Sequence, residues 1–267
     1  MRHVADYLSV PEQPAECATH GPYVSRKYLS VWTRCPKCAA AEVADLEAFT
    51  QRAAQAGRLI AWQRAVGDAG IPERFQDRTF DTYLAETSAQ QNALRLAREY
   101  AEGFGAYGRV GANLMFLGRP GTGKTHLAAA IGMHLLRNGR SVLFSTVQRA
   151  IRRVRDTWAD GSRTSESAAV DVLTTPDLLI LDEVGIQVGS EFERTMLFDM
   201  LNERYERRRS VLLLSNLSAA QMRDYLGERI YDRLREDGGR IVLFGWDSYR
   251  PVLGAMARAA SENGAGE

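Results

Sequence analysis

From residue 113 onward, short apolar runs alternate with segments that have the length and periodicity of helices. The apolar runs predict strands at 113–117, 141–146, 178–182, 211–215 and 240–244. The segments between them predict helices at 124–137, across 147–174, at 191–208 and across 218–236. Alternation of this kind is typical of a parallel sheet wrapped by helices. We therefore predict an α/β fold in which helices flank a parallel five-stranded sheet.

The chain before this region follows another pattern. An alanine-rich stretch with apolar residues at three- and four-residue steps predicts a helix over 39–66, ended by Gly67 and Gly70. A new unit opens directly after these glycines. We therefore place a domain boundary near residue 70, with an N-terminal domain over 1–70 and a larger domain over 71–267.

Two features link that boundary to the alternating region. Thr87, with Gln90 three residues later, fits a capping box and predicts a helix from about 88 to 104. The glycine-rich residues 103–111 that follow are expected to be a connector.

Composition and charge narrow the function classes. The 267 residues are 45% hydrophobic and 25% charged, which are ordinary values for a globular protein. A net charge of +1 gives no overall attraction to nucleic acid or membranes, so any site for a polyanion must be a local patch. No apolar run approaches the roughly 18 residues of a membrane span, and the N-terminus lacks the apolar core of a signal peptide. We expect a cytoplasmic protein with no membrane partner.

A glycine-rich loop joins the first predicted strand of the sheet to the next helix. Gly118 and Gly123 of this loop, followed by Lys124 and Thr125, match the phosphate-loop pattern. Backbone N–H groups and the helix N-terminus attract phosphate oxygens, Lys124 reaches the β- and γ-phosphates, and Thr125 binds Mg²⁺. A chance match is the alternative, which the flanking strand and helix disfavour. The expected nucleotide-binding residues are Gly118, Pro120, Gly121, Thr122, Gly123, Lys124, Thr125 and His126.

Two further strands lead into polar residues that suit catalysis. Asp182 is expected to hold Mg²⁺, directly or through water, and Glu183 to orient and deprotonate the attacking water. Asn216 follows the strand at 211–215 and is expected to hydrogen-bond the γ-phosphate or that water. Helix capping by the acids and a turn at the asparagine are the alternatives. With the phosphate loop, these residues predict a hydrolytic ATPase rather than a small-molecule kinase.

All three cysteines fall within the first 38 residues. With one histidine they form two close pairs, Cys17 with His20 and Cys35 with Cys38. A hairpin-sized segment separates the pairs, and its β-prone residues 23–24 and 28–32 are candidates for two strands. This spacing is typical of a zinc ribbon, whose Cys₃His set would make a closed, structural site. Free thiols beside a surface histidine are the alternative.

Arginines gather in the helical region after the second predicted strand of the sheet. Arg149, Arg152, Arg153 and Arg155 are followed by Trp158. Positive charge beside an aromatic ring suits single-stranded DNA, because arginine meets phosphates and a base stacks on the ring. A solvated basic face with an inward-packed tryptophan is the alternative.

Several stretches resemble the bacterial replicative helicase loaders of the DnaC type, which belong to the AAA+ ATPases. They are the phosphate loop, residues 181–185, the Gly-Glu-Arg stretch at 226–234 and the Trp-Asp-Ser-Tyr-Arg stretch at 246–250. The resemblance covers roughly residues 71–253. The Cys/His segment before it is more similar to phage- or prophage-encoded relatives.

The resemblance implies roles for further residues. In AAA+ proteins a neighbouring subunit donates an arginine to the γ-phosphate, and the matching position here is Arg233, with Arg229 as the alternative. Arg250 resembles a second nucleotide-sensing arginine, and residues 71–75 and 79–80 resemble the segment near the adenine. Trp158 and Phe192 match positions that contact DNA, so the expected DNA-binding residues are Arg152, Arg153, Arg155, Trp158 and Phe192.

We expect an ATP-dependent loader of the hexameric replicative helicase onto single-stranded DNA. Residues 1–70 would bind the helicase, and the ATPase domains would self-associate as an open ring or spiral. The cofactors would be ATP, Mg²⁺ and Zn²⁺. One alternative is a transposition helper ATPase that remodels a transposase on duplex DNA. The other is a non-enzymatic adaptor in which ATP only sets the conformation.

Overall fold

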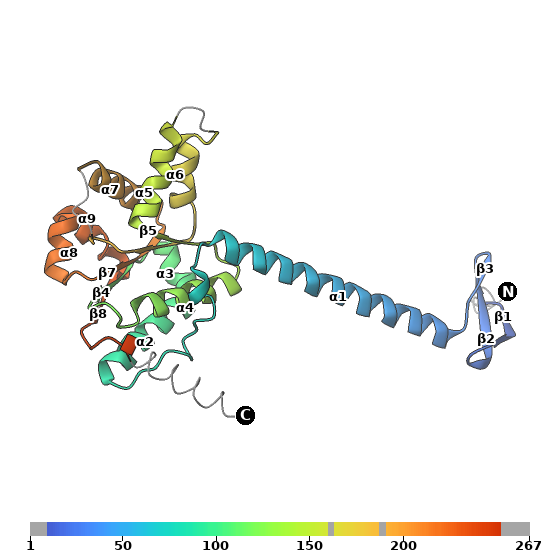
Figure 1. The fold of residues 1–267 in the computed structure, drawn as a ribbon. Helices are drawn as coiled ribbons and strands as arrows, with labels where there is room; N and C mark the ends of the chain where they lie inside the picture. The colour runs from blue at the N-terminus through green and yellow to red at the C-terminus, as the bar shows by residue number, and fades with distance from the viewer. Residues whose placement is uncertain (1–9, 160–162, 187–190, 252–267) are drawn as a thin grey trace, which may run out of the picture. The chain divides into compact units, whose positions relative to one another are not determined.

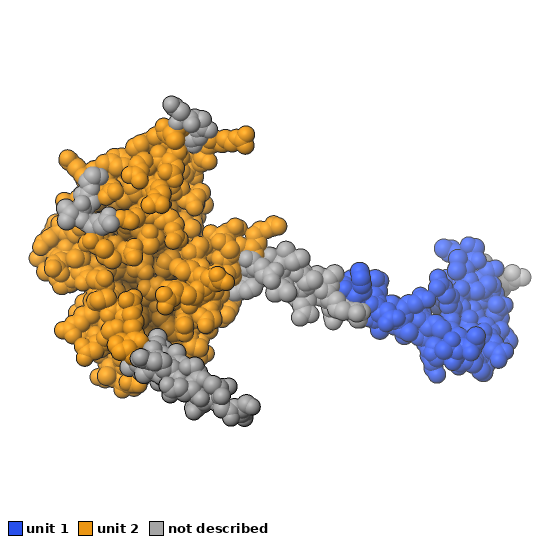
Figure 2. All heavy atoms as spheres, viewed as in Figure 1, with its two compact units in different colours: residues 1–61 blue, residues 62–267 orange. Residues whose placement is uncertain are grey.

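The structure is a computed structural model of the chain, and it describes residues 10–159, 163–186 and 191–251. The chain divides into two compact units, residues 1–61 and 62–267, which Figure 2 draws in blue and orange. Across the described residues, every helix falls short of the continuous apolar length that crossing a bilayer requires.

The first unit contains an antiparallel sheet with strand order β1-β2-β3 (Figure 1). Its strands are β1 Glu12–Cys17, β2 Gly21–Tyr28 and β3 Val31–Trp32. Residues 23–24 and 31–32 lie in strands as predicted, but Tyr28 belongs to β2, and β1 has no counterpart among the expected strands. β1 is mostly polar and contains Pro14, so its strand conformation comes from pairing with β2.

The helix α1, Pro36–Asp68, is longer than the predicted 39–66. Proline suits the first position of a helix, because its fixed φ fits and no N–H there needs a partner. The early start places Cys38 in the first turn of α1, three residues after Cys35.

The second unit confirms the predicted sheet, which is parallel throughout in the order β5-β6-β7-β4-β8. Its strands are β4 Leu114–Gly118, β5 Val142–Thr146, β6 Leu178–Asp182, β7 Ser210–Ser215 and β8 Arg240–Phe244. Each lies within about a residue of its predicted range. The helices are α2 Ser88–Glu102, α3 Phe104–Val110, α4 Lys124–Arg137, α5 Val147–Arg155, α6 Glu166–Thr174, α7 Glu191–Glu206, α8 Ala219–Leu226 and α9 Glu228–Arg233. Short 3₁₀ turns lie at Glu73–Phe75, Asp156–Trp158 and Glu236–Gly238.

Two hydrophobic cores lie on opposite faces of this sheet. Side chains of β4 alternate between them, with Leu114 and Phe116 in one core and Met115 and Leu117 in the other. The first core contains residues of α2 and α4, and the second contains residues of α5 to α9 (Figure 1). Burial on both faces explains why the strands are almost continuously apolar.

One predicted connector is wrong, because residues 104–110 form α3. Its two glycines give the segment low helix propensity. Packing compensates, since Phe104 is buried against Tyr100 of α2 and Tyr107 stacks on the same ring at 5.8 Å between centroids. The predicted capping box is confirmed at the start of α2, where Thr87 and Gln90 each bond the other's backbone N–H.

Parallel pairing brings the carboxyl ends of the strands to one edge of the sheet. Gly118 of β4 is level with Phe244 of β8, and Asp182 of β6 is level with Thr146 of β5. In a parallel α/β sheet, this edge is where ligands bind. Asp182 ends β6 at this edge, and the phosphate loop, Glu183 and Asn216 come directly after strands there.

Candidate functional site

The phosphate loop is the turn from β4 into α4, and it borders a cavity of about 290 Å³. Lys124 is the first residue of α4 and is buried. Its ammonium donates to the carbonyl oxygens of Gly118 and Arg119, both at 2.7 Å, and to Oδ1 of Asn216 at 2.9 Å. Burial lowers the pKa of Lys124 to about 8, Asp182 opposes that shift and Arg250 adds to it. The lysine and the asparagine that the sequence assigns to nucleotide chemistry are therefore in contact.

Thr125 and Asp182 form the candidate magnesium site. The Thr125 hydroxyl donates to Oδ2 of Asp182 at 3.0 Å. Neighbouring ligands of an octahedral Mg²⁺ lie about 2.9 Å apart, so the spacing and the oxygen donors both fit this ion. Burial raises the pKa of Asp182, while hydrogen bonds from the Glu183 N–H and Thr125 and the charge of Lys124 oppose the rise.

Glu183 directly follows β6 and lines the same cavity. Its φ is +64°, an uncommon value for a residue with a side chain, and its N–H donates to Oδ1 of Asp182 at 2.7 Å. That bond fixes the orientation of the Asp182 carboxylate. A carboxylate beside the phosphate cavity is suited to hold and deprotonate a water molecule.

Further lining residues of the cavity come from the segment before α2 and from the segment after β8. Arg74, Phe75 and Leu84 belong to the first, near the residues expected beside the adenine, and Arg250 belongs to the second. A flat aromatic ring and apolar contacts suit a purine base, whereas an arginine suits phosphate.

His126, also expected at the nucleotide, borders the cavity, but its imidazole is already engaged. Nε2 lies 2.9 Å from the carbonyl oxygen of Thr79, and the ring meets Tyr83 edge-on at 5.3 Å between centroids. A carbonyl accepts only, so Nε2 carries the proton. Burial lowers the pKa of His126, which favours the neutral ring.

Sequence patterns assigned no role to two aromatic residues of this cavity, Tyr83 and Trp246. The Tyr83 hydroxyl and the Trp246 indole Nε1 both donate to the carbonyl oxygen of Thr122, at 3.4 and 2.9 Å. Trp246 lies in the Trp-Asp-Ser-Tyr-Arg stretch that resembles the family, and this resemblance was the only indication in the sequence that Trp246 belongs to the site. No local pattern points to Tyr83.

The two arginines considered for a neighbouring subunit's site differ in their surroundings. Arg233 is half-buried, donates to Oδ1 of Asn202 and lies over the Tyr205 ring, 4.7 Å from its centroid. Arg229 is exposed and has no hydrogen bond or ion pair among the described residues. Both lie on α9, outside the cavity of their own chain.

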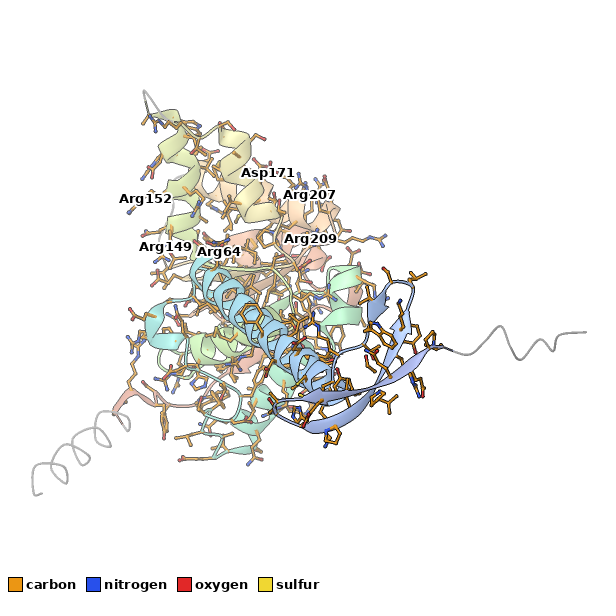
Figure 3. The ribbon with its side chains drawn as sticks, turned by 90° about the vertical axis from the view of Figure 1, so that its right-hand side faces the viewer. Arg64, Arg149, Arg152, Asp171, Arg207 and Arg209 are labelled. Carbon is orange, nitrogen blue, oxygen red and sulfur yellow. The ribbon has the colours of Figure 1, made fainter. Side chains whose placement is uncertain are left out.

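The expected DNA-binding residues fall into two groups. Trp158 and Phe192 are partly exposed and pack edge to face, 5.1 Å between centroids, and the indole donates to Glu166 at 2.8 Å. Arg152 and Arg153 line a separate hollow between α5 and α6, and Figure 3 labels Arg152 with its neighbour Arg149. The four arginines of α5, Arg149, Arg152, Arg153 and Arg155, are all exposed.

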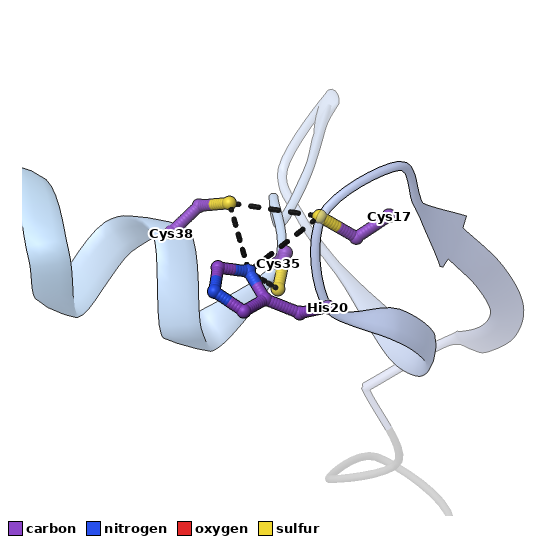
Figure 4. A group of neighbouring side chains, drawn as sticks. All are labelled: Cys17, His20, Cys35 and Cys38. Carbon is purple, nitrogen blue, oxygen red and sulfur yellow. Dashed lines mark hydrogen bonds between the residues drawn. The ribbon is translucent and has the colours of Figure 1, made fainter.

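The four predicted zinc ligands converge in the first unit (Figure 4). His20 Nδ1 lies 3.7, 3.7 and 3.3 Å from the sulfurs of Cys17, Cys35 and Cys38, and the sulfurs of Cys17 and Cys38 are 3.6 Å apart. Ligands of a tetrahedral zinc ion lie about 3.5 to 3.8 Å apart, so the set fits Zn²⁺. Hydrogen bonds from the backbone of Thr19 and then His20 lower the pKa of Cys17 to about 6, whereas the hydrogen bond with the Cys17 sulfur raises the pKa of Cys38 to about 11. Of these two thiols, Cys17 is therefore the one that favours the thiolate form without a metal.

Comparison with known proteins agrees with this geometry. The sequence family described as IstB-like ATP binding protein matches residues 62–251. The replicative helicase loader DnaC of Escherichia coli K12 is 39% identical over 193 residues, which cover 72% of this chain and 77% of that protein. The replicative helicase loader DnaC of Buchnera aphidicola subsp. Schizaphis graminum is 38% identical over 196 residues, covering 73% and 78%.

A solved structure shares the fold. The crystal structure of the DnaC helicase loader aligns with a TM-score of 0.58 at 24% identity, and the alignment covers 64% of this chain and 98% of that one. The family match spans most of the chain, and the two named relatives are similar over about three quarters of its length. The chain therefore belongs to the IstB-like ATP binding protein family, together with the replicative helicase loaders named DnaC.

Proposed function

We propose that this chain is an ATPase that loads the hexameric replicative helicase onto single-stranded DNA during replication initiation. The observation that carries the proposal is the similarity to relatives named replicative helicase loaders, at 38–39% identity over most of both chains. The gathering of Lys124, Asp182, Glu183 and Asn216 around one cavity supports it, because a loader of this kind needs a complete ATP site.

In the proposed ATP site, each side chain has a separate task. Lys124 exchanges its contacts with loop carbonyls for the β- and γ-phosphate oxygens. Thr125 and Asp182 hold Mg²⁺, which when bound neutralises charge on the phosphates. Glu183 orients a water molecule and takes its proton, and Asn216 donates to that water or to the γ-phosphate.

Hydrolysis is proposed to occur between subunits. An arginine of the neighbouring subunit stabilises charge on the γ-phosphate, as in other ATPases with such a residue. Arg229 is free to reach across an interface, whereas Arg233 must first release Asn202. Because each site would then need an arginine from the next subunit, ATP would be hydrolysed only where subunits are assembled in an open ring or spiral.

Single-stranded DNA is proposed to lie against α5 and the start of α7. The paired rings of Trp158 and Phe192 give an exposed platform on which a base can stack. Arg152, Arg153 and Arg155 have no hydrogen bond or ion pair among the described residues and are available for phosphates.

The region 1–70 is proposed to bind the helicase, with zinc holding its sheet to the start of α1. Large apolar side chains are exposed on both elements of this unit. They recur at three-residue steps on α1, as Val43, Leu46 and Phe49, and they cluster on β2, β3 and the turn between them, as Val24, Tyr28, Leu29 and Val31. Exposed apolar clusters of this kind suit contact with another protein.

A loading assay tests this function. A single-stranded circle is coated with single-strand binding protein and carries one annealed, labelled strand, so that helicase alone cannot enter. With ATP and this chain added, the helicase is expected to displace the labelled strand, whereas Lys124→Ala gives no more displacement than helicase alone.

The transposition-helper alternative is not favoured, because the relatives at 38–39% identity are named replicative helicase loaders, although the matching family is described as IstB-like. If this alternative is correct, the chain should bind duplex DNA at least as well as single-stranded DNA. No stimulation of strand displacement, combined with ATP hydrolysis that duplex DNA stimulates more than single strands do, would contradict loading and favour this alternative.

A further inference from the structure

Two carbonyl groups of the phosphate loop are held by residues from distant parts of the chain. The carbonyl oxygen of Gly121 accepts from the N–H of Tyr249 at 2.9 Å. The next carbonyl, that of Thr122, accepts from the Trp246 indole at 2.9 Å and from the Tyr83 hydroxyl at 3.4 Å. One donor segment follows β8, and the other precedes α2.

Holding a carbonyl fixes the N–H group of the same peptide. A trans peptide is planar, and its C=O and N–H point in opposite directions. The carbonyls of Gly121 and Thr122 belong to the peptides that carry the N–H groups of Thr122 and Gly123. Those two N–H groups therefore point away from the three donors, and no described residue accepts a hydrogen bond from either. They are free for phosphate oxygens.

The two segments that supply the donors touch the loop at its glycines. A Cβ on Gly123 would lie 2.6 Å from the Tyr83 ring, and a Cβ on Gly121 would lie 2.0 Å from Oγ of Ser248. Both residues also have positive φ, at +94° and +77°. Glycine is required here for the loop's conformation and also for the approach of the two segments.

Trp246 is itself held in place by aromatic packing. Its ring lies 4.9 Å from that of Phe244, the last residue of β8, and Phe244 lies 5.0 Å from Phe116 of β4. The indole N–H is therefore positioned by the core of the sheet from which the loop emerges. The Tyr83 hydroxyl adds a longer and weaker bond to the same carbonyl.

We propose that Trp246 and Tyr83 are positioning residues of the nucleotide site. By holding the Thr122 carbonyl, they orient the Gly123 N–H toward the place where phosphate oxygens bind. The inference rests on the proposed ATP site and adds two residues whose action on the nucleotide is indirect. It implies that losing the indole N–H weakens binding of phosphates and leaves binding of the nucleoside unchanged.

The test is Trp246→Phe, which keeps an aromatic ring against Phe244 and removes the N–H. The dissociation constants of MgATP and MgADP are expected to rise about two- to tenfold, the effect of one neutral hydrogen bond. The inhibition constant of adenosine and the kcat of hydrolysis should change less than twofold. Tyr83→Phe should have a smaller effect, and the double variant a larger one than either.

Control variants distinguish a wrong positioning role from a wrong ATP site and from general damage to the protein. Tyr107→Phe removes a similar aromatic donor near Arg240, at the other end of β8, and should leave nucleotide binding unchanged. Lys124→Ala should abolish ATP binding, and if it does not, the proposed ATP site itself is wrong. If Lys124→Ala behaves as expected but the double variant binds MgATP like the wild type, only the positioning role is overturned. An equal loss for adenosine and MgADP also overturns it, because that pattern indicates general damage.

If Trp246→Phe does not fold, the wild-type protein still provides a test. With ¹⁵N-labelled tryptophan, the Trp246 indole proton should exchange more slowly with solvent once MgADP is bound, because the bound loop holds its carbonyl more rigidly. Unchanged exchange at saturating MgADP would overturn the inference.

Discussion

Lys124 is surrounded by oxygens before any nucleotide arrives. Two loop carbonyls and the Asn216 amide satisfy the three hydrogens of its ammonium, although the side chain is buried. A buried cation without such partners would be costly, so these contacts hold the charge where the phosphates bind. Nucleotide binding therefore exchanges one set of oxygens for another.

The lowered pKa of Lys124 predicts a pH dependence of ATP binding. The free protein loses the Lys124 proton as the pH rises through about 8, whereas bound phosphates favour the charged form. ATP affinity should therefore be full below this pKa and fall up to tenfold per pH unit above it. Dissociation constants measured between about pH 7.5 and 9.5 check this. Lys124→Arg is the control, because its charge persists over the range and its affinity should stay flat.

Replacing Glu183 should separate ATP binding from hydrolysis. Glu183→Gln keeps the size of the side chain but cannot take a proton from water, so hydrolysis should fall about 10²- to 10⁴-fold. MgATP affinity should remain within about threefold of wild type, since the phosphate contacts are intact. Single-turnover hydrolysis and equilibrium binding measure the two effects. Loading that persists at the wild-type level in Glu183→Gln would instead favour the non-enzymatic adaptor.

At the residue scale, sequence patterns found what lies in local motifs. Lys124, Thr125 and Asp182 stand at fixed places relative to strands, and the structure brings them together. Sequence patterns did not identify Tyr83 and Trp246 as site residues, because each acts on the Thr122 carbonyl, which is distant from both in the sequence. Only the three-dimensional fold makes these residues neighbours of the loop.

At the scale of elements, the first unit has the features of a small fold that a metal stabilises. Among its described residues only Ser25 and Cys35 are buried, so it has almost no core. Small units of this kind usually depend on a metal or disulfides. Zinc would join β1, the turn after it and the start of α1.

We expect one zinc ion per chain by elemental analysis and its loss in Cys38→Ser. That variant should lose the β-sheet signals of residues 12–32 in NMR spectra. MgATP affinity should stay within about twofold of wild type, because the ATP site lies wholly in the second unit. A zinc-free wild type whose sheet signals are intact would contradict the structural role of the metal.

The elements that sequence patterns missed have a common cause. Continuous apolar runs identify strands such as β6, because these strands are buried on both faces. β1 and α3 have weak local signals, one with a proline and the other with two glycines, and they form through pairing with β2 and packing against Tyr100. Tertiary contacts outweighed local propensity in both.

At the scale of the whole molecule, the proposal requires that active sites form between subunits. Arg229→Ala or Arg233→Ala would remove the donated arginine but keep the ATP site, whereas Glu183→Gln keeps the arginine and disables the site. Each variant alone should hydrolyse ATP slowly. An equal mixture of Glu183→Gln with the correct arginine variant should recover about a quarter of wild-type activity if subunits mix at random. No recovery with either arginine variant would argue against a shared site.

The mixture also identifies the donated arginine. Only the variant that lacks the true donor should be both inactive alone and rescued by Glu183→Gln. An arginine that serves only the fold, through the Asn202 and Tyr205 contacts of Arg233, would lower thermal stability and show no rescue.

The central claim is that this chain assembles with the replicative helicase, and one measurement tests it most directly. The purified chain is mixed with the hexameric replicative helicase of its host and MgATP, and the mass of the complex is measured in solution by light scattering. The account predicts a stable complex with the mass of one helicase hexamer plus several copies of this chain. Two separate masses, with ATP hydrolysis still stimulated by DNA, would contradict it.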